Sequence, residues 1–458
     1  NISGYTISKI EKIISHYQKL NIAELIIQIG FQFFPTDIKN IAINKISVLK
    51  SAFPDNNFCF ADHLSGEKDF AKILPSIVYA LGCEYIEKHV CLDRSKTKYD
   101  FHSSLEYNEI KDCLSYLKST VKANSSQFIS DKEVIYLEKS IQKPLVIKDK
   151  TKGSLISKKE LLYRRTNLEG ISYDRINSLQ SKFQILKKDI KANNPILESF
   201  FSRAKVGVII ACRMKSSRLK KKAILPLNNI SSLERCVNNS LMFPNVDTFV
   251  VATSENEEDK ILKDYMGNNK VHFWQGSADD VISRYIGACE YYGIDIVIRV
   301  TADCCLISPE IAEILLKSHF SNGADFTASK TCAIGSSPEI YNLNALKKIH
   351  SYFGSTKYSE YMNFYMRNNP KHFKINELDL PKELIRNYRL TLDYKEDLEM
   401  FDILYCELEK NNLSTNLQDV FYILDKNPEI VNLNKHLTLK YKTDKALINK
   451  LNQVTKIK

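Results

Sequence analysis

Six cations and two hydroxyls are concentrated in one short segment of this sequence. The segment follows the apolar run Val206–Ala211 and reads Cys212-Arg-Met-Lys-Ser-Ser-Arg-Leu-Lys-Lys-Lys222. Guanidinium groups offer several donors in one plane and ammonium groups offer point charge, and phosphate oxygens accept both. The unbroken β-branched run favours a buried parallel strand, and nucleotides bind at the loop after the first strand of such sheets. This basic loop (residues 212–222) is a candidate triphosphate site; the alternative is a solvated charge run.

Two aspartates further along are candidate ligands for Mg²⁺. Asp303 follows the apolar strand predicted at residues 296–300, and Asp393 ends the strand-like residues 388–392. Mg²⁺ binds through one or two carboxylates together with substrate phosphates. Either aspartate alone is more typical of a cap or turn, but together, in the sheet that carries the basic loop, they predict a metal pair.

Two histidines form a second candidate site, near the start of the chain. His63 and His89 stand at the ends of two successive predicted strands, residues 57–61 and 84–90. Imidazoles at adjacent strand ends can share one divalent transition ion. The alternative is that both are ordinary packed or surface histidines.

The elements that must position these residues fall into three segments. In the first, strands at residues 25–28, 57–61 and 84–90 alternate with helices at 7–19, 37–52, 70–81 and 106–122. This alternation predicts βαβ units and a parallel sheet. Polar residues, Gln32 among them, follow each strand, where ligands gather in parallel α/β folds.

The other two segments follow a polar linker at residues 123–132. A small domain spans residues 133–201, with a short strand at 144–147 and a Ser157–Glu160 capping box. A doubly wound, Rossmann-like α/β sheet domain then spans 204–435, with strands at 206–211, 248–252 and 294–300 and helices at 257–265 and 280–292. Residues 436–458 form a basic C-terminal tail.

Composition agrees with a chain of several domains that binds anions. At roughly 150 residues per domain, 458 residues suggest about three domains. The net charge of +11 excludes an acidic disordered chain and favours anionic ligands, without implying nucleic acid. Eleven cysteines without a CxxC pair suit reduced thiols. With neither a signal peptide nor an apolar run of about 18 residues, we expect a cytoplasmic protein without membrane spans.

Four blocks of the third segment resemble the cytidylyltransferases of the spore-coat-polysaccharide type, relatives of the CMP-sugar synthetases. They begin at Val208 with the basic loop, at Phe273 (Phe-Trp-Gln-Gly-Ser-Ala-Asp-Asp), at Arg299 (Arg-Val-Thr-Ala-Asp) and at Arg389 (Arg-Leu-Thr-Leu-Asp). The resemblance implies CTP and Mg²⁺ as ligands. It assigns the nucleotide to Arg213, Ser216, Ser217, Arg218 and Lys222, the metal to Asp303 and Asp393, and substrate contacts to Gln275, Asp280, Arg284 and Arg299.

The basic loop departs from that family at three positions. Lys215, Lys220 and Lys221 stand where the family usually has glycines and a proline. Because glycine there permits unusual backbone dihedrals, we expect the lysines to reshape the loop. Later, Ala302 and Cys305 replace a usual glycine and a usual proline.

The first segment resembles the C-terminal part of the N-acetylneuraminate synthases, TIM-barrel enzymes that condense phosphoenolpyruvate with an N-acyl sugar. The resemblance is carried by Phe31-Gln-Phe-Phe-Pro-Thr36, Ala61-Asp-His63, Ile86-Glu-Lys-His89 and the stretch from Leu92 through Asp100 to Glu106. It implies His63 and His89 as ligands of a divalent, Mn²⁺-like metal, and Gln32 and Asp100 as site residues. Residues 1–122 would then be the last strands of a barrel.

The small domain resembles the antifreeze-like SAF cap of the same synthases, through Lys152-Gly-Ser-Leu-Ile-Ser and Arg164-Arg-Thr-Asn-Leu-Glu-Gly-Ile. The resemblance implies that Arg165, with Arg164 next to it, reaches the sugar in a partner's barrel, and hence a homodimer. Ala61 stands where the synthases have a phosphate-binding serine. Since the chain opens at Asn1, in what resembles the loop after the fifth barrel strand, we expect no synthase activity from these 458 residues.

The main hypothesis is therefore a fused enzyme of sialic-acid-like (nonulosonic) sugar activation. Its C-terminal domain would transfer a cytidylyl group from CTP to an acidic nine-carbon sugar and release pyrophosphate. One alternative keeps the cytidylyltransferase but changes the acceptor to another sugar or a polyol phosphate. Another is a nucleotide-sugar-binding or scaffold subunit without turnover. The sequence shows no basic module interleaved with aromatic residues that would indicate nucleic-acid binding.

Overall fold

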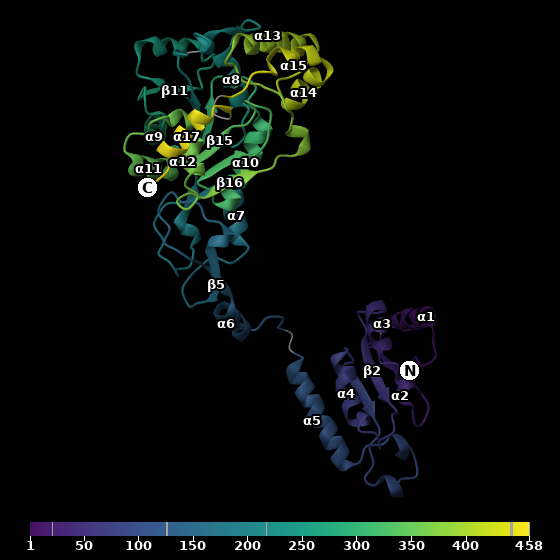
Figure 1. Cartoon of the computed structure of the whole chain (residues 1–458). Helices are drawn as coiled ribbons and strands as arrows, with labels where there is room; N and C mark the ends of the chain where they lie inside the picture. The colour runs from purple at the N-terminus through teal and green to yellow at the C-terminus, as the bar shows by residue number, and fades with distance from the viewer. Residues whose placement is uncertain (21, 125–126, 217, 440–442, 458) are drawn as a thin grey trace. The chain divides into compact units, whose positions relative to one another are not determined.

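The computed structural model describes residues 1–20, 22–124, 127–216, 218–439 and 443–457, and the chain divides into two compact units. The first unit spans Asn1–Ile135 and the second Tyr136–Lys458 (Figure 1). Each carries one of the two candidate sites.

The first unit is built on a three-stranded parallel sheet in the order β1-β2-β3. Its strands are β1 (Ile26–Ile29), β2 (Asn57–Asp62) and β3 (Tyr85–Lys88). Its helices are α1 (Ile7–Gln18), α2 (Ile38–Ile41), α3 (Asn44–Ala52), α4 (Phe70–Ala80) and α5 (Tyr107–Ala123). Apolar faces of α1, α3 and α4 pack on β1 and β2 around Phe58, Phe60 and Leu74. The predicted alternation of strands and helices is confirmed.

One helix prediction in this unit is wrong. Residues 37–52 form two helices, α2 and α3, rather than one. Ala42 between them adopts a left-handed backbone with φ 48°, which a right-handed helix cannot include. The short α2 therefore ends before α3 begins.

The second unit is built on a seven-stranded mixed sheet in the order β12-β11-β8-β13-β15-β14-β16. The strands are β8 (Val206–Ala211), β11 (Thr248–Ser254), β12 (His272–Gly276), β13 (Ile296–Thr301), β14 (Phe326–Ser329), β15 (Glu339–Asn342) and β16 (Ile375–Leu378). Strand β15 runs antiparallel to both its neighbours, and the other pairs are parallel. The α/β prediction is confirmed, with a mixed sheet.

Both faces of this sheet are covered, which explains the unbroken apolar run of β8. Val206, Val208 and Ile210 enter one core, and Ile209 enters the other. A central strand covered on both sides is apolar at every position instead of alternating.

The helices of the sheet domain are α8 (Ser232–Leu241), α9 (Val281–Tyr292), α10 (Pro309–Asn322), α11 (Leu343–Phe353), α12 (Met362–Arg367), α13 (Lys395–Lys410), α14 (Leu417–Lys426) and α15 (Pro428–Asn434). Helices α9, α11 and α12 line the core around Ile209, and the other five line the opposite core. Helices α13, α14 and α15 gather in one group (Figure 1). Strands β9 (Pro226–Leu227) and β10 (Ile230–Ser231) form a small hairpin. Residues 257–265, predicted as a helix, form a 3₁₀ helix.

The region before the sheet belongs to the same compact unit. It contains α6 (Asp131–Ser140), which spans the boundary between the units, α7 (Arg175–Ser181) and two antiparallel pairs, β4 (Gln142–Val146) with β5 (Leu161–Arg165) and β6 (Gln184–Leu186) with β7 (Phe201–Arg203). It packs on the sheet domain through ring contact between Phe183 and Phe320 and a hydrogen bond from Asn344 to the Lys152 carbonyl. The Ser157–Glu160 capping box is confirmed, and it opens a 3₁₀ turn.

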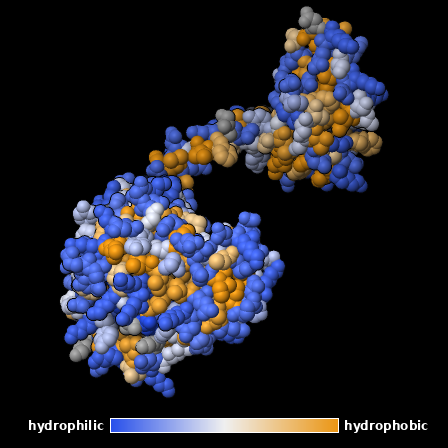
Figure 2. Space-filling view, turned by 90° about the horizontal axis from the view of Figure 1, so that it is seen from above, coloured by the Kyte–Doolittle hydropathy of each residue, from blue (hydrophilic) through white to orange (hydrophobic). Residues whose placement is uncertain are grey.

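The predicted basic tail contains a helix, α17 (Lys445–Val454). Leu451 of this helix is fully buried, and Asn368 Nδ2 donates to Thr455 Oγ1 at 2.7 Å. The end of the chain therefore packs on the sheet domain. In the part of the chain that the structure describes, none of the helices has the length and apolarity that a membrane span requires. Figure 2 shows a mostly hydrophilic surface with apolar patches.

Candidate active site

A cavity of about 390 Å³ opens in the second unit where β8 and β13 end. Its wall includes the basic loop, the ends of β8 and β13, Glu339 of β15, Arg284 of α9 and the stretch around Glu360. The cations that line it are Arg213, Lys215, Arg218, Lys222, Arg284 and Arg299, and the carboxylates are Asp303, Glu339, Glu360 and Asp393. The carboxyl ends of parallel strands thus meet a strongly charged cleft, as the sequence predicts for a doubly wound sheet.

The basic loop contributes four of its predicted nucleotide-binding residues to the cleft wall: Arg213, Ser216, Arg218 and Lys222. The fifth, Ser217, lies outside the described residues. Lys221 has a left-handed backbone with φ 56°, at a position where the resemblance led us to expect glycine. A residue with a Cβ adopts this dihedral at a cost of about 1 kcal/mol.

Lys222 joins the two predicted metal carboxylates. Its ammonium lies 2.7 Å from Asp303 Oδ2 and 2.8 Å from Asp393 Oδ1. Burial favours the neutral forms of Lys222 and Asp303, but the opposite charges outweigh it. They lower the pKa of Asp303 to about 2 and raise the pKa of Lys222. Lys222 and Asp303 are thus ionised at neutral pH, and the two aspartates lie close enough to share one cation.

Asp393 does not follow a strand, contrary to the prediction for residues 388–392. That segment makes only an isolated bridge, Arg389 with Ile334. It passes so close to Gly335 that a Cβ there would lie 2.0 Å from the Leu390 carbonyl oxygen. Leu392 N–H donates to the Asp303 carbonyl at 2.9 Å. This last contact brings Asp393 beside Asp303 without a ladder.

Asp393 also has two arginine partners. Arg218 donates to Asp393 Oδ1 at 2.7 Å, and Arg389 donates to Asp393 Oδ2 at 3.3 Å. Arg389 is itself held by both oxygens of Asp397, at 2.8 and 3.0 Å. The Asp393 carboxylate is therefore positioned by charge on both of its oxygens.

The opposite wall of the cleft is a network around Arg299 and Glu339. Glu339 Oε2 accepts from Arg299 Nη1 at 2.9 Å and from the Tyr341 hydroxyl at 2.8 Å. Arg213 of the basic loop reaches Glu360 Oε2 at 3.2 Å, and Arg299 donates to the Glu360 carbonyl at 3.0 Å. This network links the loop to the stretch before α12.

The remaining predicted substrate residues have structural contacts. Arg284 lines the cleft but donates to the carbonyls of Ser277 and Ala278. Asp280 caps α9 and accepts from the Thr356 N–H at 2.8 Å. Gln275 on β12 donates to the Ser254 carbonyl. Neither Gln275 nor Asp280 is among the described residues that line the cleft.

The cysteines near the cleft are protonated thiols. All eleven in the chain are free. Burial raises the pKa of Cys304, which lines the cleft beside Asp303, to about 12, and also raises the pKa of Cys212. Since the thiolate is the nucleophilic form, these side chains are poor nucleophiles at neutral pH.

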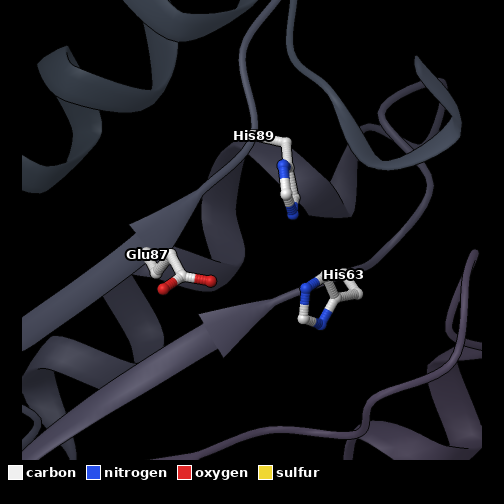
Figure 3. Close-up of side chains that lie close together, drawn as sticks. All are labelled: His63, Glu87 and His89. Atoms are coloured by element: carbon white, nitrogen blue, oxygen red, sulfur yellow. The ribbon is translucent and has the colours of Figure 1, made fainter. Parts of the chain in front are cut away.

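In the first unit, His63 and His89 meet as predicted, and Glu87 joins them (Figure 3). Ligand atoms of these three residues all lie within 4.8 Å of one another. The side chains point toward a common space at the ends of β2 and β3 (Figure 3). Burial lowers the pKa of His63, whose Nδ1 lies 3.2 Å from the Phe31 carbonyl. A neutral imidazole is the form that binds metals.

The residues around this cluster fix the histidines in place. Lys88 and Asp62, each one residue before a histidine, form a buried ion pair at 3.0 Å between β3 and β2. Asp100 Oδ2 lies 3.9 Å from His89 Nδ1. Gln32 is exposed in the loop after β1, next to Phe31. The structure therefore gathers Asp100 with the histidines, whereas no contact of Gln32 with them is seen among the described residues.

Comparison with known proteins settles the family. The model of the cytidylyltransferase family matches residues 207–445, more than half of the chain. The chain belongs to the cytidylyltransferase family. The NeuB family model matches residues 4–128, so this cytidylyltransferase carries a NeuB-like region ahead of its sheet domain.

Several relatives match one part or the other. An uncharacterized protein of Methanocaldococcus jannaschii is 30% identical over 239 residues, 52% of this chain and 97% of that protein. Spore coat polysaccharide biosynthesis protein SpsF of Bacillus subtilis is 29% identical over 228 residues, 48% of this chain and 94% of that protein. A solved cytidylyltransferase from Leptospira borgpetersenii is 30% identical, covers 52% of this chain and 99% of its own, and has a TM-score of 0.47.

The NeuB-like region has a curated relative in N-acetylneuraminate-9-phosphate synthase of Drosophila melanogaster. It is 26% identical over 106 residues, which are 23% of this chain and 27% of that protein. The matched residues thus span about a quarter of the length of this synthase.

Two residues of the cytidylyltransferase were missed by sequence reasoning. Glu87 stands within the quoted Ile86-Glu-Lys-His89 stretch, and its position two residues before His89 in the strand predicted at residues 84–90 would put both on one face. Asp259 is buried, and its carboxylate accepts from the Met214 N–H at 2.6 Å and from the Thr253 hydroxyl at 2.9 Å. Nothing in the sequence around Asp259 indicates that it faces the basic loop.

Proposed function

We propose that the sheet domain transfers a cytidylyl group from CTP to an acidic nine-carbon sugar of the sialic-acid type, with Mg²⁺, and releases pyrophosphate. The observation that carries this proposal is the cleft in which the basic loop meets Asp303 and Asp393. A triphosphate needs several cations in one place, and a metal needs hard oxygen ligands beside the phosphates. The NeuB-like region on the same chain supports a sialic-acid-like acceptor.

The proposed reaction is a displacement at the α-phosphorus. The acceptor hydroxyl oxygen forms a bond to that phosphorus, the bond from phosphorus to the bridging oxygen of the β-phosphate breaks, and the hydroxyl proton passes to solvent. Arg213, Ser216, Ser217, Arg218 and Lys222 hold the phosphates and balance their charge in the transition state. No covalent enzyme intermediate is needed, which agrees with the protonated thiols near the cleft.

The donor set fits Mg²⁺. Asp303 and Asp393 provide hard carboxylate oxygens close to one cation position, which the Lys222 ammonium takes in this structure. When bound, the ion would withdraw electron density from the phosphate oxygens and stabilise the charge that develops there. Arg299 would face the acceptor from the opposite wall, and Arg284 would shape the cleft. Asp280 and Gln275 would act by holding α9 and β11 in place.

A second activity is favoured by the His63–Glu87–His89 cluster. We propose that residues 1–122 are the last strands of a synthase-type TIM barrel whose complete form condenses phosphoenolpyruvate with an N-acyl sugar at a divalent, Mn²⁺-like metal. The three side chains supply nitrogen and oxygen ligands suited to such ions, while Asp100 and Gln32 would contact substrate. Residues 133–201 would be the SAF-like cap, with the exposed Arg165 of β5 reaching a partner's barrel in a homodimer.

Pyrophosphate release tests the main proposal. The full chain with CTP, Mg²⁺ and N-acetylneuraminate is expected to release pyrophosphate, and Asp303→Asn and Asp393→Asn to reduce kcat at least about 100-fold by removing a charge at the reacting phosphate. Asp379→Asn, an exposed aspartate of the same unit, is the matched control. Release only with another sugar or a polyol phosphate would change the acceptor. No release with any acceptor would leave a binding or scaffold subunit.

The synthase proposal has a separate test. The described residues of the first unit form an open three-stranded sheet, and a barrel needs a closed one. We therefore expect the 458-residue chain to show no condensation of phosphoenolpyruvate with N-acetylmannosamine in the presence of Mn²⁺. Measurable phosphate release that depends on both substrates would contradict this expectation.

A further inference from the structure

Lys222 occupies the cation position that the proposed function gives to a metal. Its side chain is 18% exposed, and its ammonium contacts Asp303 Oδ2 and Asp393 Oδ1 at 2.7 and 2.8 Å. One positive group thus bridges two carboxylates, as a hard metal ion would. The ammonium and a metal ion compete for the same two oxygens.

The charge count around the pair disfavours a metal that arrives alone. Three cations, Lys222, Arg218 and Arg389, already match the three carboxylates of Asp303, Asp393 and Asp397. A divalent ion added to this balanced group would give it an excess of positive charge at close range, where the repulsion is only partly screened. Removal of one or two cations must accompany its binding.

Lys222 and Arg218 are the two cations that a nucleotide can withdraw. Both belong to the basic loop and line the cleft, and phosphate oxygens are strong acceptors for ammonium and guanidinium groups. Arg389 is different, since it is buried and held by both oxygens of Asp397. A bound triphosphate would therefore attract Lys222 and Arg218 away from the carboxylates and leave Arg389 in place.

The backbone of Lys222 allows this exchange without movement of the loop. Its carbonyl accepts from the Ser232 hydroxyl of α8 at 2.6 Å, and η5 (Lys222–Ile224) begins at this residue. With the backbone anchored, rotation of the flexible four-carbon side chain can move the ammonium from the carboxylates to a phosphate.

We propose that Lys222 makes metal binding at Asp303 and Asp393 conditional on the nucleotide. In the free protein the Lys222 ammonium pairs with the two carboxylates. When CTP binds, the ammonium moves from the carboxylates to the triphosphate, so that the metal enters with or after CTP. This inference rests on the proposed function for the identity of the two ligands. It adds an order of binding and assigns Lys222 as the residue that sets this order.

The test is Mn²⁺ binding by electron paramagnetic resonance without nucleotide. The full chain carries His63→Ala and His89→Ala throughout, so that the first unit does not contribute. Lys222→Met, which keeps the length of the side chain without its charge, is expected to tighten Mn²⁺ binding at least about tenfold, and Lys222→Arg to leave it weak. Adding Asp393→Asn to Lys222→Met is expected to remove the gain. Lys222→Gln replaces Lys222→Met if that variant does not fold.

A second measurement follows CTP binding in the presence of EDTA. The chain with Lys222 is expected to bind CTP without metal, and Lys222→Met to bind it at least about tenfold more weakly. Equal Mn²⁺ affinity of the chains with and without the Lys222→Met substitution, or a CTP affinity that needs metal, would overturn the proposal. Neither readout requires turnover, so absent pyrophosphate release would reject the proposed function and leave this inference testable.

Discussion

The carboxylate of Asp259 accepts a hydrogen bond from the backbone N–H of Met214 at 2.6 Å. Its other oxygen accepts from the hydroxyls of Thr253 and Ser254 at the end of β11. One buried carboxylate thus ties the start of the basic loop to the neighbouring strand. This anchor holds the backbone between Arg213 and Lys215.

Asp259→Ala is expected to weaken CTP binding about tenfold or more. The substitution leaves three buried donors without their acceptor, each at a cost of about 1–3 kcal/mol, and releases the loop. Asp259→Asn keeps a carbonyl oxygen for the Met214 N–H and should recover most of the affinity. Calorimetric titration of CTP into the two variants checks this, and unchanged affinity in Asp259→Ala would reject a positioning role.

Asp280→Ala is expected to lower the free energy of unfolding of the second unit by about 2–4 kcal/mol. Asp280 caps α9 and holds Thr356 through its N–H and hydroxyl, and loss of a cap and of buried acceptors has costs of this size. Urea unfolding followed by Trp274, the single tryptophan of the chain, measures the effect. The exposed neighbour Asp279→Ala is the control and should be nearly neutral. A stable Asp280→Ala chain would instead point to a role in the reaction.

The first unit is expected to bind Mn²⁺ through His63, Glu87 and His89. His63→Ala and Glu87→Gln should each weaken binding about tenfold or more, since each removes a ligand from the cluster. His16→Ala, a substitution on helix α1, serves as the matched control. Calorimetry on the full chain with Asp303→Asn keeps the cleft from contributing. Equal affinities for Mn²⁺ in the His16 and His63 variants would show that the cluster is not a metal site.

The second unit is expected to lose stability as the pH is lowered, because of His319. This side chain is fully buried, with Nδ1 2.9 Å from the Thr327 hydroxyl, and burial lowers its pKa from 6.5 to about 3. Between these values the unfolded chain binds a proton that the folded chain does not, so stability declines as pH falls through that window, by at most about 1.4 kcal/mol per pH unit.

His319→Gln tests this pH dependence. Glutamine can still meet the Thr327 hydroxyl but does not titrate, so the slope of unfolding free energy against pH between about 6 and 4 should be smaller than in the unsubstituted chain. Urea unfolding at several pH values, followed by Trp274, provides the comparison. An unchanged slope would place the proton uptake elsewhere.

The strands that carry both sites are local features that the sequence pattern predicts. Val206–Ala211 is apolar at every position because both faces of β8 are covered, and that pattern is visible before folding. The position of His63 and His89 after two successive strands predicts that they lie close together, since neighbouring parallel strands end at one edge of the sheet. Where a backbone break decides the element, as at Ala42 in residues 37–52, the pattern alone predicts one continuous helix in place of two.

What the sequence by itself determined is the α/β class, the order of the segments, and the types of side chain that each strand delivers to the sheet edge. Only the tertiary structure decided which of them touch. Lys222 and Asp393 are 171 residues apart, and their contact depends on a segment without a regular strand. Asp259 likewise meets Met214 of the basic loop from 45 residues away. Periodicity reports whether a side chain faces the core or solvent, whereas a contact between distant residues depends on how whole elements pack.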